Sequence, residues 1–145
     1  GLGMQIMYDV NAHFTTDENM ADVGIAVVGE KPYAEGWGDN ENPVLPPEDL
    51  EVISSLRKVS KKIIVIIVSG RPLFLPDEME QWEAIVAAWL PGTEGAGVAP
   101  VLFGKKPFGG KLPLPWPANR NQLPFSPDGK ASDKTEPLFP KGFGL

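Results

Sequence analysis

The sequence predicts an α/β fold in which helices cover a mostly parallel sheet. Two apolar runs, at residues 22–28 and 62–68, are rich in Val and Ile and do not alternate polar with apolar residues. Strands covered on both faces of a parallel sheet have this composition. Between them, residues 48–59 place apolar side chains at helical spacing after two prolines, which favours an amphipathic helix. Strand, helix and strand in succession build a parallel sheet.

Two weaker apolar segments extend the predicted sheet. Residues 4–10 have the composition of a further strand, and so do residues 84–90. The second segment is equally compatible with a buried helix, because alanine dominates it. With both segments included, we expect four strands.

The chain changes in character toward its C-terminus. Residues 93–103 begin with a threonine that can cap a helix, so a short second helix is expected. From residue 104 onward Gly, Pro and single aromatic residues recur without a period, which indicates extended chain wrapped over the sheet. We therefore expect an α/β sandwich domain at residues 1–125. A polar loop and C-terminal tail at residues 126–145 should pack on the same domain.

Three tryptophans mark expected packing sites. Trp82 and Trp89 have apolar neighbours and are expected to lie in the core. Trp116 stands among prolines and is expected to pin the tail to the sheet.

Composition excludes several classes of function. The 145 residues carry 13 basic and 19 acidic side chains, so neither nucleic acid nor a membrane surface is an expected partner. There is no cysteine, and His13 is the only histidine, which excludes thiol chemistry and a multi-histidine zinc site, and no cofactor is predicted. The longest apolar run is far shorter than the ~18 residues of a membrane span. The first residues lack the basic and apolar regions of a signal peptide.

Three loops are candidates for a ligand site, because parallel sheets bind ligands outside the carboxyl ends of their strands. They lie at residues 29–47, 69–76 and 91–97, and each follows a predicted strand. All three are rich in Gly, Pro and charged residues.

The first loop carries the residue types that glycoside chemistry requires. It contains the carboxylates Glu30, Glu35 and Asp39, together with Tyr33 and Trp37. One carboxyl group can protonate a leaving oxygen while another attacks or activates water, and an aromatic face can stack on a sugar ring. From composition alone a solvated acidic turn is the more common outcome, because surface carboxylates are rarely catalytic.

The other two loops give weaker signals. Arg71 could hold a ligand carboxylate or a loop aspartate, but an ion pair that fixes loop geometry is favoured. The third loop resembles a phosphate-binding turn, yet it lacks both phosphate-binding glycine patterns, and Glu94 would face the phosphate. Close packing of the loop backbone is the expected reason for its glycines.

Several motifs together resemble the C-terminal domain of family 3 glycoside hydrolases. In chain order they are VVGEKPYAEGWGDN at residues 27–40, VSGRP at 68–72, AWLPGTEG at 88–95, LFG at 102–104, FGGKLP at 108–113, QLP at 122–124 and PLFPKGFGL at 137–145. The resemblance extends from about Met4 to the last residue. It is strongest to the β-glucosidase and β-glucan exohydrolase branch.

The resemblance implies a fold, a reaction and site residues. Members join an N-terminal barrel domain, which supplies an aspartate nucleophile, to an α/β sandwich domain that lends a glutamate acid/base. The matching glutamate is Glu35, with Trp37 and Asp39 as candidate substrate-binding residues, whereas Glu30 is expected to be structural. The implied reaction is retaining hydrolysis of a terminal, non-reducing β-D-glucosyl or related residue from an oligosaccharide or glycoside.

The sequence also departs from the family pattern. The domain begins some tens of residues earlier in relatives, so its first strand and helix, and an aromatic residue that clamps a second sugar, are expected to be missing. Lys105 follows Gly104 where an acidic residue is more usual. Because the resemblance places the nucleophile on the barrel domain, and a retaining mechanism needs two carboxyl groups, the chain alone is expected to be inactive.

Two other functions remain open from the sequence. One is a non-catalytic scaffold or glucan-binding accessory domain. The other is a doubly wound nucleotide-binding domain, which the missing phosphate motifs disfavour. The sugar, the linkage and the location of the parent enzyme are not indicated.

Overall fold

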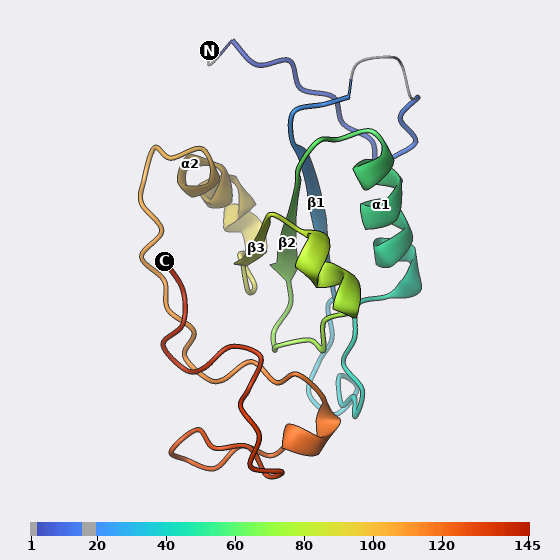
Figure 1. Cartoon of the computed structure of the whole chain (residues 1–145). Helices are drawn as coiled ribbons and strands as arrows, with labels where there is room; N and C mark the ends of the chain where they lie inside the picture. The colour runs from blue at the N-terminus through green and yellow to red at the C-terminus, as the bar shows by residue number, and fades with distance from the viewer. Residues whose placement is uncertain (1–2, 16–19) are drawn as a thin grey trace.

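The computed structural model describes residues 3–15 and 20–145. Three strands form one parallel sheet in the order β1 (Gly24–Gly29), β2 (Ile63–Val68) and β3 (Ala84–Ala87) (Figure 1). Because the strands run in the same direction, their carboxyl ends share one edge of the sheet and the following loops meet there. The predicted α/β class with a parallel sheet is confirmed.

The helix between the first two strands forms where the sequence predicts it. Helix α1 (Pro47–Lys58) starts with a proline in its first turn, followed by two acidic residues, and has two basic residues in its last turn. These charges complement the helix dipole. Ile53 and Leu56 are its buried side chains, and the helix packs against β1 and β2. The apolar side of α1 thus covers one face of the sheet.

The remaining helical elements are short. They are the 3₁₀ helices η1 (Asp77–Gln81), η2 (Gly92–Gly97) and η3 (Arg120–Gln122), and the α-helix α2 (Val98–Leu102). The single helix predicted at residues 93–103 is therefore a 3₁₀ segment that continues into one short α-helical turn. The described part of the chain contains no helix that is long and apolar enough to cross a membrane.

Strand β1 is covered on one face only, which corrects the prediction that the run at residues 22–28 is covered on both. Ala26 and Val28 are buried beneath α1, whereas Ile25 and Val27 are 36% and 65% exposed. β1 lies at the edge of the sheet, and α1 covers only one of its faces. The central strand β2 does match the prediction, because Ile66 on the opposite face is also buried.

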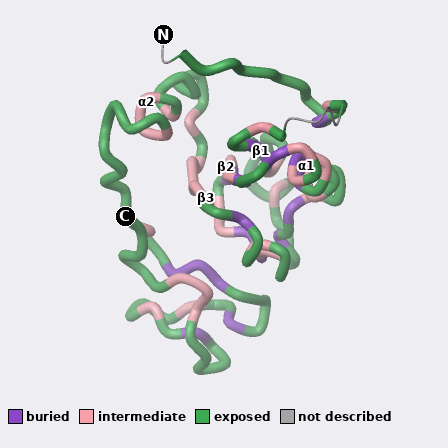
Figure 2. The backbone as a smooth tube through the Cα atoms, turned by 45° about the horizontal axis from the view of Figure 1, so that its top comes forward, coloured by how far each residue is buried: buried purple, intermediate pink, exposed green. Residues whose placement is uncertain are grey.

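The weaker strand predictions have opposite outcomes. Residues 84–90 do contain a strand, β3, rather than a buried helix. Residues 4–10 form no strand and are all exposed, with Ile6 at 77% and Val10 at 70%. Figure 2 shows this segment as an exposed trace that passes outside the sheet. The described chain therefore has three strands rather than four, and this segment pairs with neither edge strand of the sheet.

The C-terminal tail packs at the carboxyl edge of the sheet. In Figure 1 it forms a layer of extended chain below the ends of β1 and β2. Trp116 is buried, donates its indole N–H to the Leu73 carbonyl at 2.7 Å and pairs through its backbone with Phe139. Trp116 therefore pins the tail as predicted. Trp82 is buried, and Trp89 packs partly buried against the core with its ring 6.1 Å from that of Trp116.

Candidate active site

Backbone hydrogen bonds join the candidate loops where they leave the sheet. The Glu30 N–H donates to the Val68 carbonyl at 3.0 Å, and the Ser69 N–H donates to the Trp89 carbonyl at 3.1 Å. The first residue after β1 is thus held against the end of β2, and the first residue after β2 is held against the segment that follows β3. Glu30 and Ser69 lie side by side, although 39 positions separate them in sequence.

Glu30 is engaged by two side chains at this edge. The Arg71 Nη2 donates to its Oε1 at 2.6 Å, and the Arg71 Nε donates to the same oxygen at 3.0 Å. The Ser69 hydroxyl donates to Oε2 at 2.5 Å. Only 12% of the Glu30 side chain and 26% of the Arg71 side chain are exposed. The ion pair is therefore charge-assisted, held by more than one hydrogen bond and largely shielded from water.

The surroundings of Glu30 hold it in its ionised form. Burial disfavours the carboxylate, but hydrogen bonds from Arg71 and Ser69 and the positive charge of Arg71 outweigh burial and lower the pKa of Glu30. The same pair raises the pKa of Arg71. This geometry agrees with a structural role for Glu30, and with the favoured interpretation of Arg71 as the partner in an ion pair.

Arg71 also reaches the part of the first loop that lies beyond Glu30. Its Nη1 donates to the Gly38 carbonyl at 2.6 Å. Its guanidinium carbon lies 4.6 Å from the centre of the Tyr33 ring, within the range of a cation–π interaction. One guanidinium therefore contacts three separate positions of the same loop.

Two glycines make room for Tyr33. A Cβ atom added at Gly38 would lie 2.1 Å from the Tyr33 ring, and one added at Gly70 would lie 2.8 Å from its hydroxyl oxygen. Any larger residue at Gly38 would require the ring to move. The sequence motifs contain these glycines but do not predict that they lie against a tyrosine.

The three predicted site residues lie together on the tip of this loop. Residues 35–38 form a turn, closed by the Gly38 N–H donating to the Ala34 carbonyl at 2.9 Å. Glu35 and Asp39 are exposed, and Trp37 is 93% exposed. Within the described ranges, neither an ion pair nor a hydrogen bond involves the Glu35 carboxylate. The tip therefore presents a carboxyl group and an indole to the space outside the carboxyl edge.

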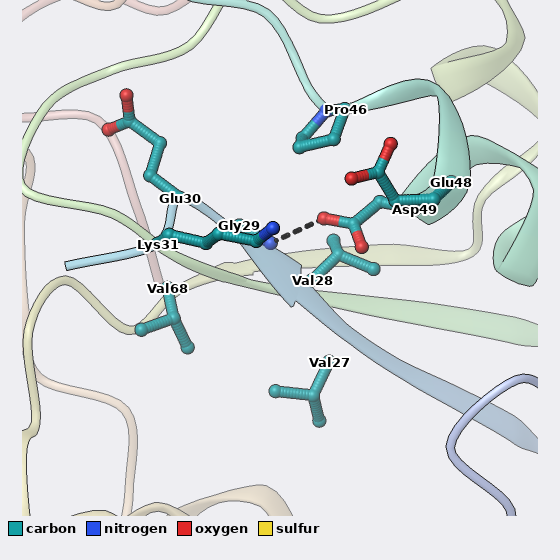
Figure 3. A pocket seen from close by; sticks show the side chains of 9 residues that line it. All are labelled: Val27, Val28, Gly29, Glu30, Lys31, Pro46, Glu48, Asp49 and Val68. Atoms are coloured by element: carbon teal, nitrogen blue, oxygen red, sulfur yellow. Dashed lines mark hydrogen bonds between the residues drawn. The ribbon is translucent and has the colours of Figure 1, made fainter.

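A shallow cavity of about 260 Å³ lies beside the loop, between the end of β1 and the first turn of α1. Figure 3 shows the carboxylates of Glu48 and Asp49 entering it from α1, with Glu30 and Lys31 coming from the strand end. The Gly29 N–H donates to Asp49 Oδ2 at 2.9 Å. Burial raises the pKa of Asp49 and outweighs this hydrogen bond, which lowers it.

Asp49 is not among the site residues that the sequence predicts. Its position in the first turn of a predicted helix that follows a strand was the only available signal. Among the described residues, no group of three or more His, Asp or Glu side chains could hold a metal ion.

The third loop differs from the expectation for its glycines. A Cβ atom added at Gly92, Gly95 or Gly97 would meet no other atom within 4 Å, so close backbone packing is the wrong explanation for them. Glu94 is exposed, and its nearest described polar contact is the Thr93 hydroxyl at 3.4 Å.

Comparison with protein families identifies the domain type. A model of the glycosyl hydrolase family 3 C-terminal domain matches residues 9–145. The periplasmic beta-glucosidase of Salmonella typhimurium is 33% identical over 145 aligned residues, which cover 86% of this chain and 19% of the relative. The xylan 1,4-beta-xylosidase of Xylanibacter ruminicola is 39% identical over 114 residues, covering 74% of this chain and 13% of the relative.

Solved structures give the same result. The beta-glucosidase D2-BGL of Chaetomella raphigera aligns with a TM-score of 0.71 at 25% identity, over 86% of this chain and 21% of that one. The glucose complex of a Kluyveromyces marxianus beta-glucosidase aligns with a TM-score of 0.70 at 27% identity, over 86% of this chain and 17% of that one. The resemblance stated from the motifs is confirmed, and the chain spans about a fifth or less of the length of these relatives.

Proposed function

Because the chain belongs to glycosyl hydrolase family 3, through its C-terminal domain, we propose that it is part of a retaining β-glycosidase. Its substrate is a terminal, non-reducing β-D-glucosyl or related residue. Glu35 is the general acid/base, and an N-terminal barrel domain carries the nucleophile. The names of the relatives, beta-glucosidases and beta-xylosidases, support this class of reaction.

The observation that carries the assignment is the contrast between the carboxylates of the first loop. A general acid/base must reach the glycosidic oxygen and exchange its proton with water. Glu35 is exposed on a turn and has no described partner, so its carboxyl group is free for this role. Glu30 is committed to Arg71 and Ser69 and stays ionised, which makes it a poor proton donor.

The two steps of the reaction assign two tasks to Glu35. In the first, the nucleophile attacks the anomeric carbon while Glu35 gives its proton to the departing glycosidic oxygen. In the second, the Glu35 carboxylate takes a proton from the water that displaces the nucleophile and releases the sugar. Trp37 offers a face for stacking on a sugar ring. Asp39, which lies near Glu35 in the same loop, is the proposed partner for a hydroxyl group of the sugar. Neither step requires a cofactor.

The test is a leaving-group comparison in the full-length enzyme. Glu35→Ala should reduce kcat/KM for an alkyl β-glucoside, whose leaving group needs protonation, by about 10²- to 10⁴-fold. A dinitrophenyl β-glucoside, whose leaving group departs unprotonated, should be affected far less in its first step. Glu94→Ala, which removes an exposed carboxylate from another loop, is the control and should leave both rates unchanged.

The exposure of Trp37 supports a second candidate, a glucan-binding accessory or scaffold domain. An indole that is 93% exposed suits stacking on a sugar whether or not chemistry follows. The same experiment separates the two candidates. Equal and small effects of Glu35→Ala on both substrates, with loss of glucan binding in Trp37→Ala, would replace the catalytic assignment with the accessory one.

A further inference from the structure

The turn that carries Glu35 has few attachments of its own to the sheet. Its internal hydrogen bonds, from Gly38 N–H to Ala34 and from Asp39 N–H to Gly36, shape the turn but do not orient it. Further along, the loop is tied down again where the Phe74 N–H donates to the Pro43 carbonyl at 2.7 Å. A further contact, between the end of β1 and Pro43, must therefore set the orientation of the turn.

Arg71 contacts both flanks of that turn. It donates to the Gly38 carbonyl on one side at 2.6 Å and lies under the Tyr33 ring on the other. Its Nε and Nη2 groups donate hydrogen bonds to Glu30, the first residue after β1. Arg71 follows β2 by only three positions, so these contacts couple the turn to two adjacent strands.

We propose that Arg71 is a positioning residue that holds the acid/base Glu35 in place, an inference that rests on the proposed function. Arg71 acts through Gly38 and Tyr33 and is not assigned a contact with the substrate. Its charge is already paired with Glu30, so it is not a free cation for binding an anion. Its planar guanidinium makes all three contacts at once.

Lysine cannot reproduce this arrangement. An ammonium group is a compact charge that can pair with Glu30, but it has no fork with which to reach the Gly38 carbonyl at the same time. Arg71→Lys should therefore keep the ion pair and loosen the turn. A displacement of about 1 Å at a catalytic group can reduce a rate by about 10²-fold.

The test uses the full-length enzyme and the same pair of substrates. Arg71→Lys and Arg71→Ala should reduce kcat/KM for the alkyl β-glucoside by about 10- to 100-fold and reduce kcat/KM for the dinitrophenyl β-glucoside far less. In a Glu35→Ala background, Arg71→Lys should cause no further loss, because residues that act through one another are not additive. If Arg71→Ala fails to fold, Arg71→Lys decides the question.

Arg57→Ala is the matched control. Arg57 also donates to a backbone carbonyl, that of Gln81 at 2.6 Å, but it lies in the last turn of α1, away from the candidate site. Its removal should leave the ratio of the two rates unchanged.

The outcomes separate this inference from the proposed function. Equal losses on both substrates for Arg71→Lys, additive with Glu35→Ala, would mean that Arg71 is structural only and would overturn the inference. If Glu35→Ala itself shows no dependence on the leaving group, the proposed function fails. If Glu35→Ala shows the dependence and Arg71→Lys does not, only the positioning role fails.

Discussion

The loop after β1 has a fixed root, at residues 30–33, and an exposed tip, at residues 35–39. The carboxylates of these two parts make different contacts. At the root, Glu30 accepts hydrogen bonds from Arg71 and Ser69. At the tip, Glu35 is exposed beside Trp37. The same residue type thus forms an internal ion pair at one position and is presented to the outside five residues later.

A loop of this kind can hold its side chains in fixed positions and still leave them accessible to a substrate. Catalytic groups need a fixed position, but they must also reach a substrate. The root supplies the fixed position through a shielded ion pair and a tyrosine ring that lies against two glycines. The Glu35 carboxylate can then remain without a partner among the described residues, which is what the proposed proton exchange requires.

The largest expected effect comes from removing each carboxylate in turn. Glu30→Ala leaves the Arg71 charge partly buried and unpaired, so it should lower the free energy of unfolding by about 2–3 kcal/mol. Glu35→Ala removes an exposed group and should change it by less than about 0.5 kcal/mol. Urea unfolding, followed by tryptophan fluorescence, measures both changes. Similar losses for the two variants would contradict the distinction between root and tip.

The residues show how far the sequence could predict this arrangement. The two apolar runs predicted β1 and β2, and the helical spacing of apolar residues between them predicted α1. Burial leaves both of these patterns in a sequence. The adjacency of Glu30 and Ser69 depends instead on the register of the sheet, in which Gly29 pairs with Val68. Composition and periodicity do not specify that register, so only the family resemblance indicated a structural role for Glu30.

Sequence patterns do not predict which faces of a strand are covered, or which distant residues come into contact. The run at residues 22–28 is as apolar as a strand buried on both faces, yet Val27 is 65% exposed. Coverage depends on which elements pack nearby, and a single segment does not contain that information. Residues 4–10 illustrate the same point, because an apolar segment becomes a strand only where it finds a pairing partner. The close approach of the Tyr33 hydroxyl to Gly70 is a further example, because the two residues are distant in sequence.

A smaller effect should come from the close contact between Gly38 and the Tyr33 ring. Gly38→Ala places a Cβ atom against the ring and should force Tyr33 away from Arg71, with a loss of about 1–2 kcal/mol in the free energy of unfolding. Gly95→Ala, at a position with open space, should change stability by less than about 0.5 kcal/mol. In a Tyr33→Ala background, Gly38→Ala should lose most of its effect. A full effect in that background would show that the tyrosine is not the cause.

The smallest expected effect is the dependence of the root on pH. The pKa of Glu30 is lower in the folded chain than its ordinary value near 4.3. The ion pair therefore stabilises the fold fully above the unfolded pKa, and this stabilisation is lost as the pH falls through the folded pKa. Asp49, whose pKa is raised by burial, has the opposite dependence, so the chain alone does not isolate the contribution of Glu30.

A difference measurement does isolate it. The free energies of unfolding of the chain and of its Glu30→Gln variant, measured between about pH 7 and pH 3, share the contribution of Asp49 and of every other group. Their difference should be constant at neutral pH and should shrink as Glu30 becomes protonated below about pH 4.3. The stability lost when Glu30 is protonated should be smaller than the stability lost in Glu30→Ala, because a protonated carboxyl group still accepts hydrogen bonds from Arg71. A difference that grows toward acid pH would mean that the folded chain raises the pKa of Glu30, and that the root is not held by an ionised pair.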